Sequence, residues 1–289
     1  MSLRGDYNLA ASDFSVEQDW SAYDEEEHAL FRRLFERQSK LARRYACPEW
    51  IDAIATLDAG REIPRFESIS RKLKLKTCWE IVAVPGLIPD EAFFTHLANR
   101  RFPVTVWLRK PAEIDYIVEP DVFHDFFGHV PLLFDPVYAD HLHEYGKGGL
   151  KAMRLEAVRM LARLYWYTIE FGLVKTNLGI RAYGAGLLSS GGELAYCVAD
   201  PAPRRLEFNL ERALRTDYLI DRYQSTYFVI DSFDQLRRET APDFTPIYEK
   251  LRALPTLEPR DEAALSRRPG RQPAPPREVA GSPFEVEAG

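Results

Sequence analysis

The sequence predicts a mainly α-helical protein with a few short β-strands, folded as a single domain. Apolar residues recur at helical spacing over several segments, and short β-branched runs end at proline or glycine. We find no internal repeat and no βαβ alternation. The 289 residues are 46% hydrophobic, which is enough to bury a sizeable core. We expect the domain to span residues 20–257, between a flexible N-terminal arm (1–19) and a disordered C-terminal tail (258–289).

The N-terminal half of the domain is predicted to be helical. Ser21 is the expected N-cap of the first helix, with Asp24 to Glu27 in its first turn, and Pro48 ends it. Further helices are expected over 48–58, from Pro64 and over 89–98. The basic run Arg71–Lys76 is read as a solvated helix end. Short strands are predicted at 79–84, 103–108 and 227–230.

In the second half, the segment 141–149 is predicted to be a glycine-spaced connection. From Leu150 to Thr168 the apolar spacing predicts one long helix, with Glu170 at its C-terminal end. A glycine-rich turn over 182–193 then leads into another helix.

Composition excludes several classes of protein. The formal charge is −6 with a pI of about 5.6, which argues against a phosphate-backbone partner. No signal peptide and no membrane span are visible. Three widely spaced cysteines form no C-x-x-C pair, so we expect neither a disulfide framework nor a zinc ribbon, and the cytoplasm is the expected location.

The segment 119–131 combines chemistry with packing. It holds His124, Asp125 and His129 among three phenylalanines. Two histidines and a carboxylate on one face suit a non-haem Fe(II) site, whereas the alternative is a pair of hydrogen-bonded histidines in an aromatic core. Residues five apart on a regular helix are rotated by about 140°, so a shared metal predicts an irregular turn here.

The third ligand is less clear from the residues alone. Glu170 lies among Trp166, Tyr167 and Phe171, where a bare carboxylate needs a cation, but it also falls in register with a polar helix face. His141 and His143 are alternative ligands that we expect to be exposed.

Other candidate groups have structural alternatives as well. Arg109, at the end of an apolar run, could grip a substrate carboxylate or form a surface ion pair. Ser190 to Glu193 matches a helix capping box. Gly184 and Gly186 are too weak a signal for a phosphate loop.

Three motifs together resemble the pterin-dependent aromatic amino acid hydroxylases, most of all the bacterial members that act on phenylalanine. They are Pro120–Asp125 with Gly128–Pro131, Tyr165–Leu173 and Tyr183–Ser190, and the likeness covers roughly residues 20 to 250. It implies a single catalytic domain of that type. The implied reaction is hydroxylation of L-phenylalanine to L-tyrosine with O₂, Fe(II) and a tetrahydropterin.

The resemblance also implies roles for individual residues. His124, His129 and Glu170 would bind Fe(II), and Arg109 would hold the carboxylate of the aromatic amino acid, with Gly186, Ser189 and Glu193 near the substrate. Phe93 matches the phenylalanine on which the pterin ring stacks. Asp125 is the expected second pterin contact, although animal members usually have Glu there. Trp166 matches the tryptophan of members that hydroxylate phenylalanine, where those acting on tryptophan tend to carry Phe.

Alternatives remain at this point. They are a tryptophan hydroxylase of the same family, a zinc hydrolase with Asp125 as general base, and a non-catalytic binding protein. The regulatory domain and the oligomerisation helix of animal members have no counterpart, and the tail after Pro259 shows no heptads. We therefore expect a monomer whose partner is a small molecule.

Overall fold

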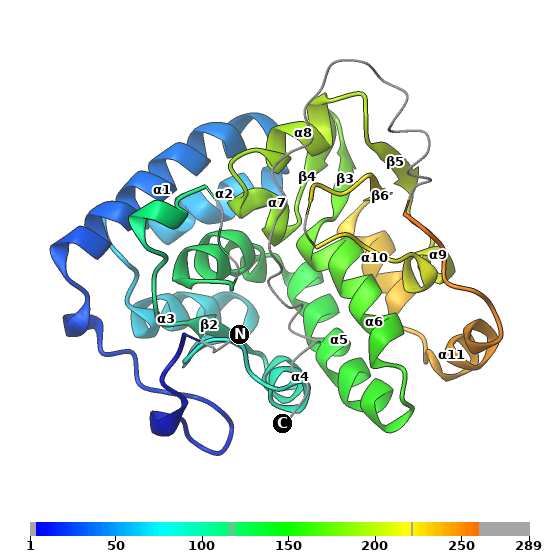
Figure 1. Ribbon diagram of the computed structural model, residues 1–289, viewed down its shortest axis with the longest axis horizontal. Helices are drawn as coiled ribbons and strands as arrows, with labels where there is room; N and C mark the ends of the chain where they lie inside the picture. The colour runs from blue at the N-terminus through cyan, green and yellow to red at the C-terminus, as the bar shows by residue number, and fades with distance from the viewer. Residues whose placement is uncertain (1–3, 116, 118, 221, 260–289) are drawn as a thin grey trace.

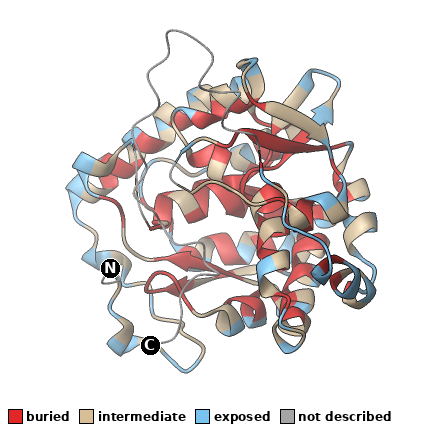
Figure 2. Ribbon diagram, turned by 45° about the vertical axis from the view of Figure 1, so that its right-hand side comes forward, coloured by how far each residue is buried: buried red, intermediate tan, exposed pale blue. Residues whose placement is uncertain are grey.

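The computed structural model describes residues 4–115, 117, 119–220 and 222–259. The fold is mostly helical with a few short strands, as predicted, and the strands form two small sheets (Figure 1). The buried residues lie on the strands and on the inward faces of the helices, and they form one core cluster (Figure 2). The α-helices are α1 Glu25–Tyr45, α2 Pro48–Leu57, α3 Phe66–Thr77, α4 Asp90–Ala98, α5 Pro136–Arg154, α6 Val158–Tyr165, α7 Ala185–Ser189, α8 Glu193–Ala199, α9 Leu210–Arg215, α10 Phe233–Thr240 and α11 Thr245–Arg252.

Two sheets organise the strands. The larger has the order β4-β3-β6-β5, in which the pairing of β3 with β4 is antiparallel and the other pairings are parallel. In the smaller, β1 and β2 pair in parallel with α4 between them in the chain. The expectation of no βαβ alternation is therefore wrong for this unit. The strands are β1 Glu80–Val84, β2 Arg101–Thr105, β3 Leu173–Thr176, β4 Gly179–Ala182, β5 Arg204–Glu207 and β6 Thr226–Ile230.

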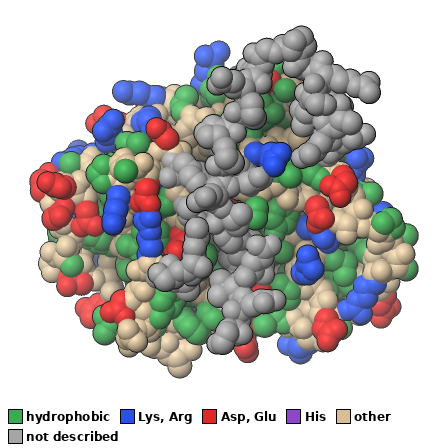
Figure 3. Space-filling view, viewed as in Figure 1, with side chains coloured by type: hydrophobic (Ala, Val, Ile, Leu, Met, Phe, Trp, Pro, Cys, Tyr) green, Lys and Arg blue, Asp and Glu red, His purple; other side chains and the backbone are tan. Residues whose placement is uncertain are grey.

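The N-terminal helices form as predicted, with shifted ends. Ser21 is not the N-cap of α1 but lies in a short 3₁₀ turn. Asp24 caps the helix instead, in a reciprocal pair with Glu27. The basic end of α3 is solvated as expected, and Leu75 there is 91% exposed. On the face shown in Figure 3, acidic and basic side chains are interspersed.

The predicted connection at 141–149 is wrong, because these residues lie inside α5. Gly146 and Gly149 face α4, and a Cβ at Gly149 would lie 2.1 Å from a ring carbon of Phe94. The glycines therefore serve close helix packing rather than chain reversal. The predicted long helix is also broken, because α5 ends at Arg154 and Glu156 has a φ of +52° before α6 begins.

The predicted N-terminal arm lies against the domain in its described part. The N–H of Val16 donates to the carbonyl of Ala83 on β1, and the hydroxyl of Tyr7 donates to Leu87 O at 2.8 Å. Most of the predicted tail lies outside the described residues. Among the described residues, no helix is both long and apolar enough to cross a bilayer.

Candidate metal centre and its pocket

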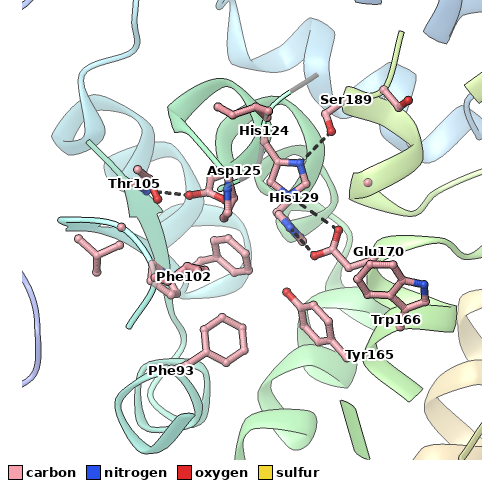
Figure 4. A pocket seen from close by; sticks show the side chains of 18 of the residues that line it. Phe93, Phe102, Thr105, His124, Asp125, His129, Tyr165, Trp166, Glu170 and Ser189 are labelled. Carbon is pink, nitrogen blue, oxygen red and sulfur yellow. Dashed lines mark hydrogen bonds and ion pairs between the residues drawn. The ribbon is translucent and has the colours of Figure 1, made fainter. Parts of the chain in front are cut away.

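Two π-helices bring three metal-binding side chains together. The π-helix η4 (His124–His129) carries both histidines, and η6 (Trp166–Glu170) ends at the glutamate. One potential ligand atom from each of His124, His129 and Glu170 lies within 4.8 Å of the others. His129 Nε2 is 3.1 Å from Glu170 Oε1, and His124 Nε2 is 3.7 Å from Glu170 Oε2. Figure 4 shows the three side chains pointing toward one another.

The π-helical turn explains how residues five apart share a face. Hydrogen bonds in a π-helix run from residue i to i+5, so the sixth residue lies over the first. The irregular turn predicted from the spacing of His124 and His129 is therefore confirmed. Gly128, inside this turn, packs on α7, since a Cβ there would lie 2.9 Å from the carbonyl oxygen of Ala185.

The electrostatics of the three groups suit a cation. Burial lowers the pKa of His124 to about 4, so its imidazole is neutral near pH 7 and offers a lone pair. Burial opposes ionisation of Glu170, but the charge and hydrogen bond of His129 outweigh it and lower the pKa of the carboxyl. A buried carboxylate beside two imidazoles is a donor set for a borderline divalent metal. The residues present therefore fit a metal ion.

Neighbouring groups orient the ligands. His124 Nδ1 lies 2.8 Å from Ser189 Oγ on α7, a hydrogen bond that fixes the ring and leaves Nε2 facing the site. Gly186 lies directly against Glu170, because a Cβ there would be 3.1 Å from Oε2. His129 is held by ring packing on Phe102 at 4.8 Å, and its Nδ1 is buried without a hydrogen-bond partner among the described residues.

Arg109 belongs to a buried ion pair, not the surface pair considered as an alternative. The guanidinium donates from Nε and Nη2 to the two oxygens of Asp121, each at 2.8 Å. Arg109 is 5% exposed and Asp121 is fully buried. Asp121 also accepts from the backbone N–H of His124 at 2.9 Å, so one carboxylate links the arginine to the metal centre.

The pocket around the metal centre is lined largely by aromatic and apolar side chains (Figure 4). Phe93 comes from α4 and meets Tyr165 edge-on at 5.8 Å. Asp125 accepts from the backbone N–H of Thr105 on β2 at 2.8 Å, and burial raises its pKa to about 7. Trp166 is half-buried and lies beside Glu170 in the wall.

The predicted site residues assemble with one exception. The pocket lining includes Phe93, Arg109, His124, Asp125, His129, Trp166, Glu170, Gly186 and Ser189. Glu193 does not line it. Its carboxylate is fully buried and accepts from Gln224 N at 2.8 Å and from the hydroxyl of Tyr227 at 2.7 Å. Ser190 Oγ accepts from Glu193 N, so only half of the predicted capping box forms.

The alternative ligands lie elsewhere. His141 is 2% exposed on α5 and hydrogen-bonded to Thr240 Oγ1 at 2.9 Å, so its predicted exposure is wrong. Sequence reasoning missed Asp121 as the partner of Arg109. Its place in the same motif as the histidines was the available signal.

Comparison with known proteins agrees with this geometry. The family model for biopterin-dependent aromatic amino acid hydroxylases matches residues 8–250. A phenylalanine-4-hydroxylase of Chromobacterium violaceum is 55% identical over 242 residues, 83% of this chain and 82% of the relative. One of Ralstonia nicotianae is 54% identical over 246 residues, 85% and 79% of the two chains. The human tyrosine 3-monooxygenase is 38% identical over 220 residues, 74% and 41%.

Solved structures agree as well. The C. violaceum enzyme with iron and phenylalanine bound superposes with a TM-score of 0.83 at 52% identity, over 87% of this chain and 92% of that one. The same enzyme bound to cobalt gives a TM-score of 0.85 at 53% identity, over 87% and 91%. The chain is a member of the biopterin-dependent aromatic amino acid hydroxylase family.

Proposed function

We propose that the protein is a phenylalanine 4-monooxygenase, which converts L-phenylalanine to L-tyrosine with O₂, Fe(II) and a tetrahydropterin. The observation that carries this proposal is the cluster of His124, His129 and Glu170 at the base of an aromatic pocket. Support also comes from relatives named phenylalanine-4-hydroxylase at 50–55% identity.

The metal ligands act by geometry and charge. His124, His129 and Glu170 would hold Fe(II) through two imidazoles and one carboxylate. When bound, Fe(II) and the tetrahydropterin supply oxygen activation and two electrons. The protein contributes orientation of the rings and exclusion of water, since the ligands are at least half-buried and the surrounding wall is largely apolar.

Arg109 is proposed to bind the substrate carboxylate. Asp121 accepts from Nε–H and from one N–H of Nη2, so the N–H groups of Nη1 and the second N–H of Nη2 remain for the substrate. The buried pair also fixes the side chain before substrate arrives, which lowers the entropic cost of binding. Because Asp121 contacts both Arg109 and the backbone of His124, it fixes the position of the substrate-binding arginine relative to the metal ligand.

The other predicted residues of the pocket are assigned to binding either the pterin or the amino acid. We assign Phe93 and Asp125, on the α4 and β2 side, to the pterin. We assign Trp166, Gly186 and Ser189 to the side of the amino acid, with Ser189 acting through His124. Glu193 is proposed to act at a distance, by fixing Gln224 and Tyr227 behind the pocket.

Anaerobic loading with Fe(II) followed by product analysis tests the proposal. We expect tyrosine from phenylalanine only with tetrahydropterin and O₂, and bound iron near one equivalent. Faster turnover of tryptophan would instead identify a tryptophan hydroxylase. Tightly held zinc without pterin-dependent oxygen uptake would favour a hydrolase.

Variants of Glu170 provide the second arm of the test. Glu170→Ala is expected to lose both iron and tyrosine formation, because no other described carboxylate joins the two histidines in a metal cluster. A Glu170→Ala protein that kept wild-type function would identify a non-catalytic binding protein. Glu67→Ala, an exposed residue on α3, is the matched control and should retain iron.

We also propose a cytoplasmic monomer that acts in phenylalanine catabolism. Cys47, Cys78 and Cys197 are all free, which favours a reducing compartment. Sedimentation of the full chain tests the monomer, and a dimer at micromolar concentration would contradict it.

A further inference from the structure

Ring packing holds the indole of Trp166 in the pocket wall. Its Nε1 is buried and has no hydrogen-bond partner among the described residues. Two rings lie nearly parallel to it, Phe171 at 4.6 Å with an interplanar angle of 29° and Tyr218 at 4.3 Å with 15°. Because no polar contact from the described residues fixes the indole, its plane depends on the rings stacked on it.

Tyr218 is the better placed of the two to set that plane. It lies in the segment after α9, separate in sequence from η6, and its stack is the closer and flatter one. By contrast, Phe171 directly follows η6, so it moves with the segment that carries Trp166.

The backbone on both sides of Tyr218 is anchored. Asp217 accepts from the guanidinium of Arg163 on α6 at 2.7 Å. Leu219 donates its N–H to Gln224 Oε1 at 3.1 Å. Ile220, two residues after Tyr218, lines the pocket itself. Tyr218 is therefore a ring on an anchored backbone that packs against the face of the Trp166 indole.

We propose that Tyr218 is a positioning residue for substrate selection, and that it acts by holding the Trp166 indole flat against the pocket. The proposal rests on the proposed function, and it adds how the pocket would favour the single ring of phenylalanine over a bicyclic ring. A fixed indole keeps the pocket narrow. A tilting indole widens it, so phenylalanine loses contact and a larger ring gains room.

Two substitutions separate the ring from the rest of the side chain. Tyr218→Phe keeps the planar face, and Tyr218→Met fills a similar volume without one. We expect Tyr218→Met to weaken phenylalanine binding about two- to tenfold, the range of one aromatic pair. KM for phenylalanine should rise accordingly with a smaller change in kcat. The ratio of kcat/KM for phenylalanine over tryptophan should fall in Tyr218→Met. In Tyr218→Phe, both KM for phenylalanine and this ratio should stay within about twofold of the wild type.

Three measurements make the test decisive. They are thermal unfolding, calorimetric binding of L-phenylalanine to the Fe(II)-loaded protein without O₂, and turnover of both amino acids. Tyr248→Met is the matched control, since Tyr248 is a buried tyrosine outside the pocket lining. It should lower stability and leave the substrate ratio unchanged.

Several outcomes would overturn the assignment. A folded Tyr218→Met protein with wild-type binding and substrate ratio would do so, as would equal losses in the Phe and Met variants. If Tyr218→Met does not fold, Arg163→Gln releases the same segment through Asp217 and should lower the ratio in the same direction. An unchanged ratio there would refute the proposal. A wild-type protein that binds phenylalanine without forming tyrosine would overturn the proposed function instead, while the binding constants would still test Tyr218.

Discussion

The contact between α4 and α5 depends on a glycine that has no room for a side chain. A Cβ at Gly146 would lie 2.4 Å from the backbone nitrogen of Ala98 and 2.6 Å from Leu97 Cβ. Backbone atoms cannot rotate away, so Gly146→Ala must push the two helices apart. Gly148, two residues along the same helix, has nothing within 4 Å of its Cβ position and provides the matched control.

The expected magnitudes follow from two opposing effects. Replacing a helical glycine with alanine favours the helix by about 1 kcal/mol at either position. At Gly146 the overpacking costs roughly 3 kcal/mol, the upper end of the usual range, because the clash is with backbone. We therefore expect Gly148→Ala to raise the free energy of unfolding by about 1 kcal/mol and Gly146→Ala to lower it by about 2 kcal/mol. The difference between them isolates the packing cost.

Equilibrium unfolding in urea measures both variants against the wild type. The reasoning is refuted if Gly146→Ala is as stable as Gly148→Ala, because that would mean the helices do not approach as closely as described. A second readout is KM for the tetrahydropterin, since α4 also carries Phe93 into the pocket. It should rise in Gly146→Ala only.

Two other perturbations give measurable outcomes. Burial lowers the pKa of His141 from 6.5 to about 4, so the folded state keeps the ring neutral and its stability is lost as the pH falls below about 6.5. Between pH 8 and pH 5 the free energy of unfolding of the wild type should fall by roughly 2 kcal/mol more than that of His141→Phe, as measured by urea unfolding at each pH. An equal fall in the two proteins would contradict this. Arg4 pairs with Glu113 in the segment that brings Asp115 to the pocket. Arg4→Ala should therefore raise KM for phenylalanine about twofold at low salt only. A rise that persists at high salt would argue against an ion-pair effect.

The elements that follow local rules were predictable from the sequence. Pro48 starts α2, the acidic residues before Glu27 start α1, and the apolar stripe of α3 is buried, as its spacing predicted. These features depend on caps and periodicity, which are written into neighbouring residues. By contrast, α5 was misread because its glycines lower helix propensity locally. Their benefit comes from α4, more than forty residues away in the chain, and no local pattern reports it.

The break between α5 and α6 was hidden for a similar reason. Glu156 adopts a φ of +52° although its sequence carries no glycine or proline signal. Apolar residues on both sides keep nearly helical spacing, so one helix was predicted. The same break removes the objection to Glu170 as a ligand. Glu156 and Glu170 do not share a polar helix face, because the break and the π-helical turn of η6 each change the register between them.

The two π-helices give a common reason for the positions of all three ligands. π-Helical turns are rare in proteins and occur frequently at functional sites. Here one such turn places His124 and His129 on one face, and the second presents Glu170 to them from η6. On regular helices the two imidazoles would point about 140° apart and could not share an ion. The five-residue spacing, which looks unfavourable on an α-helix, is therefore the local signal that this segment is built around a metal.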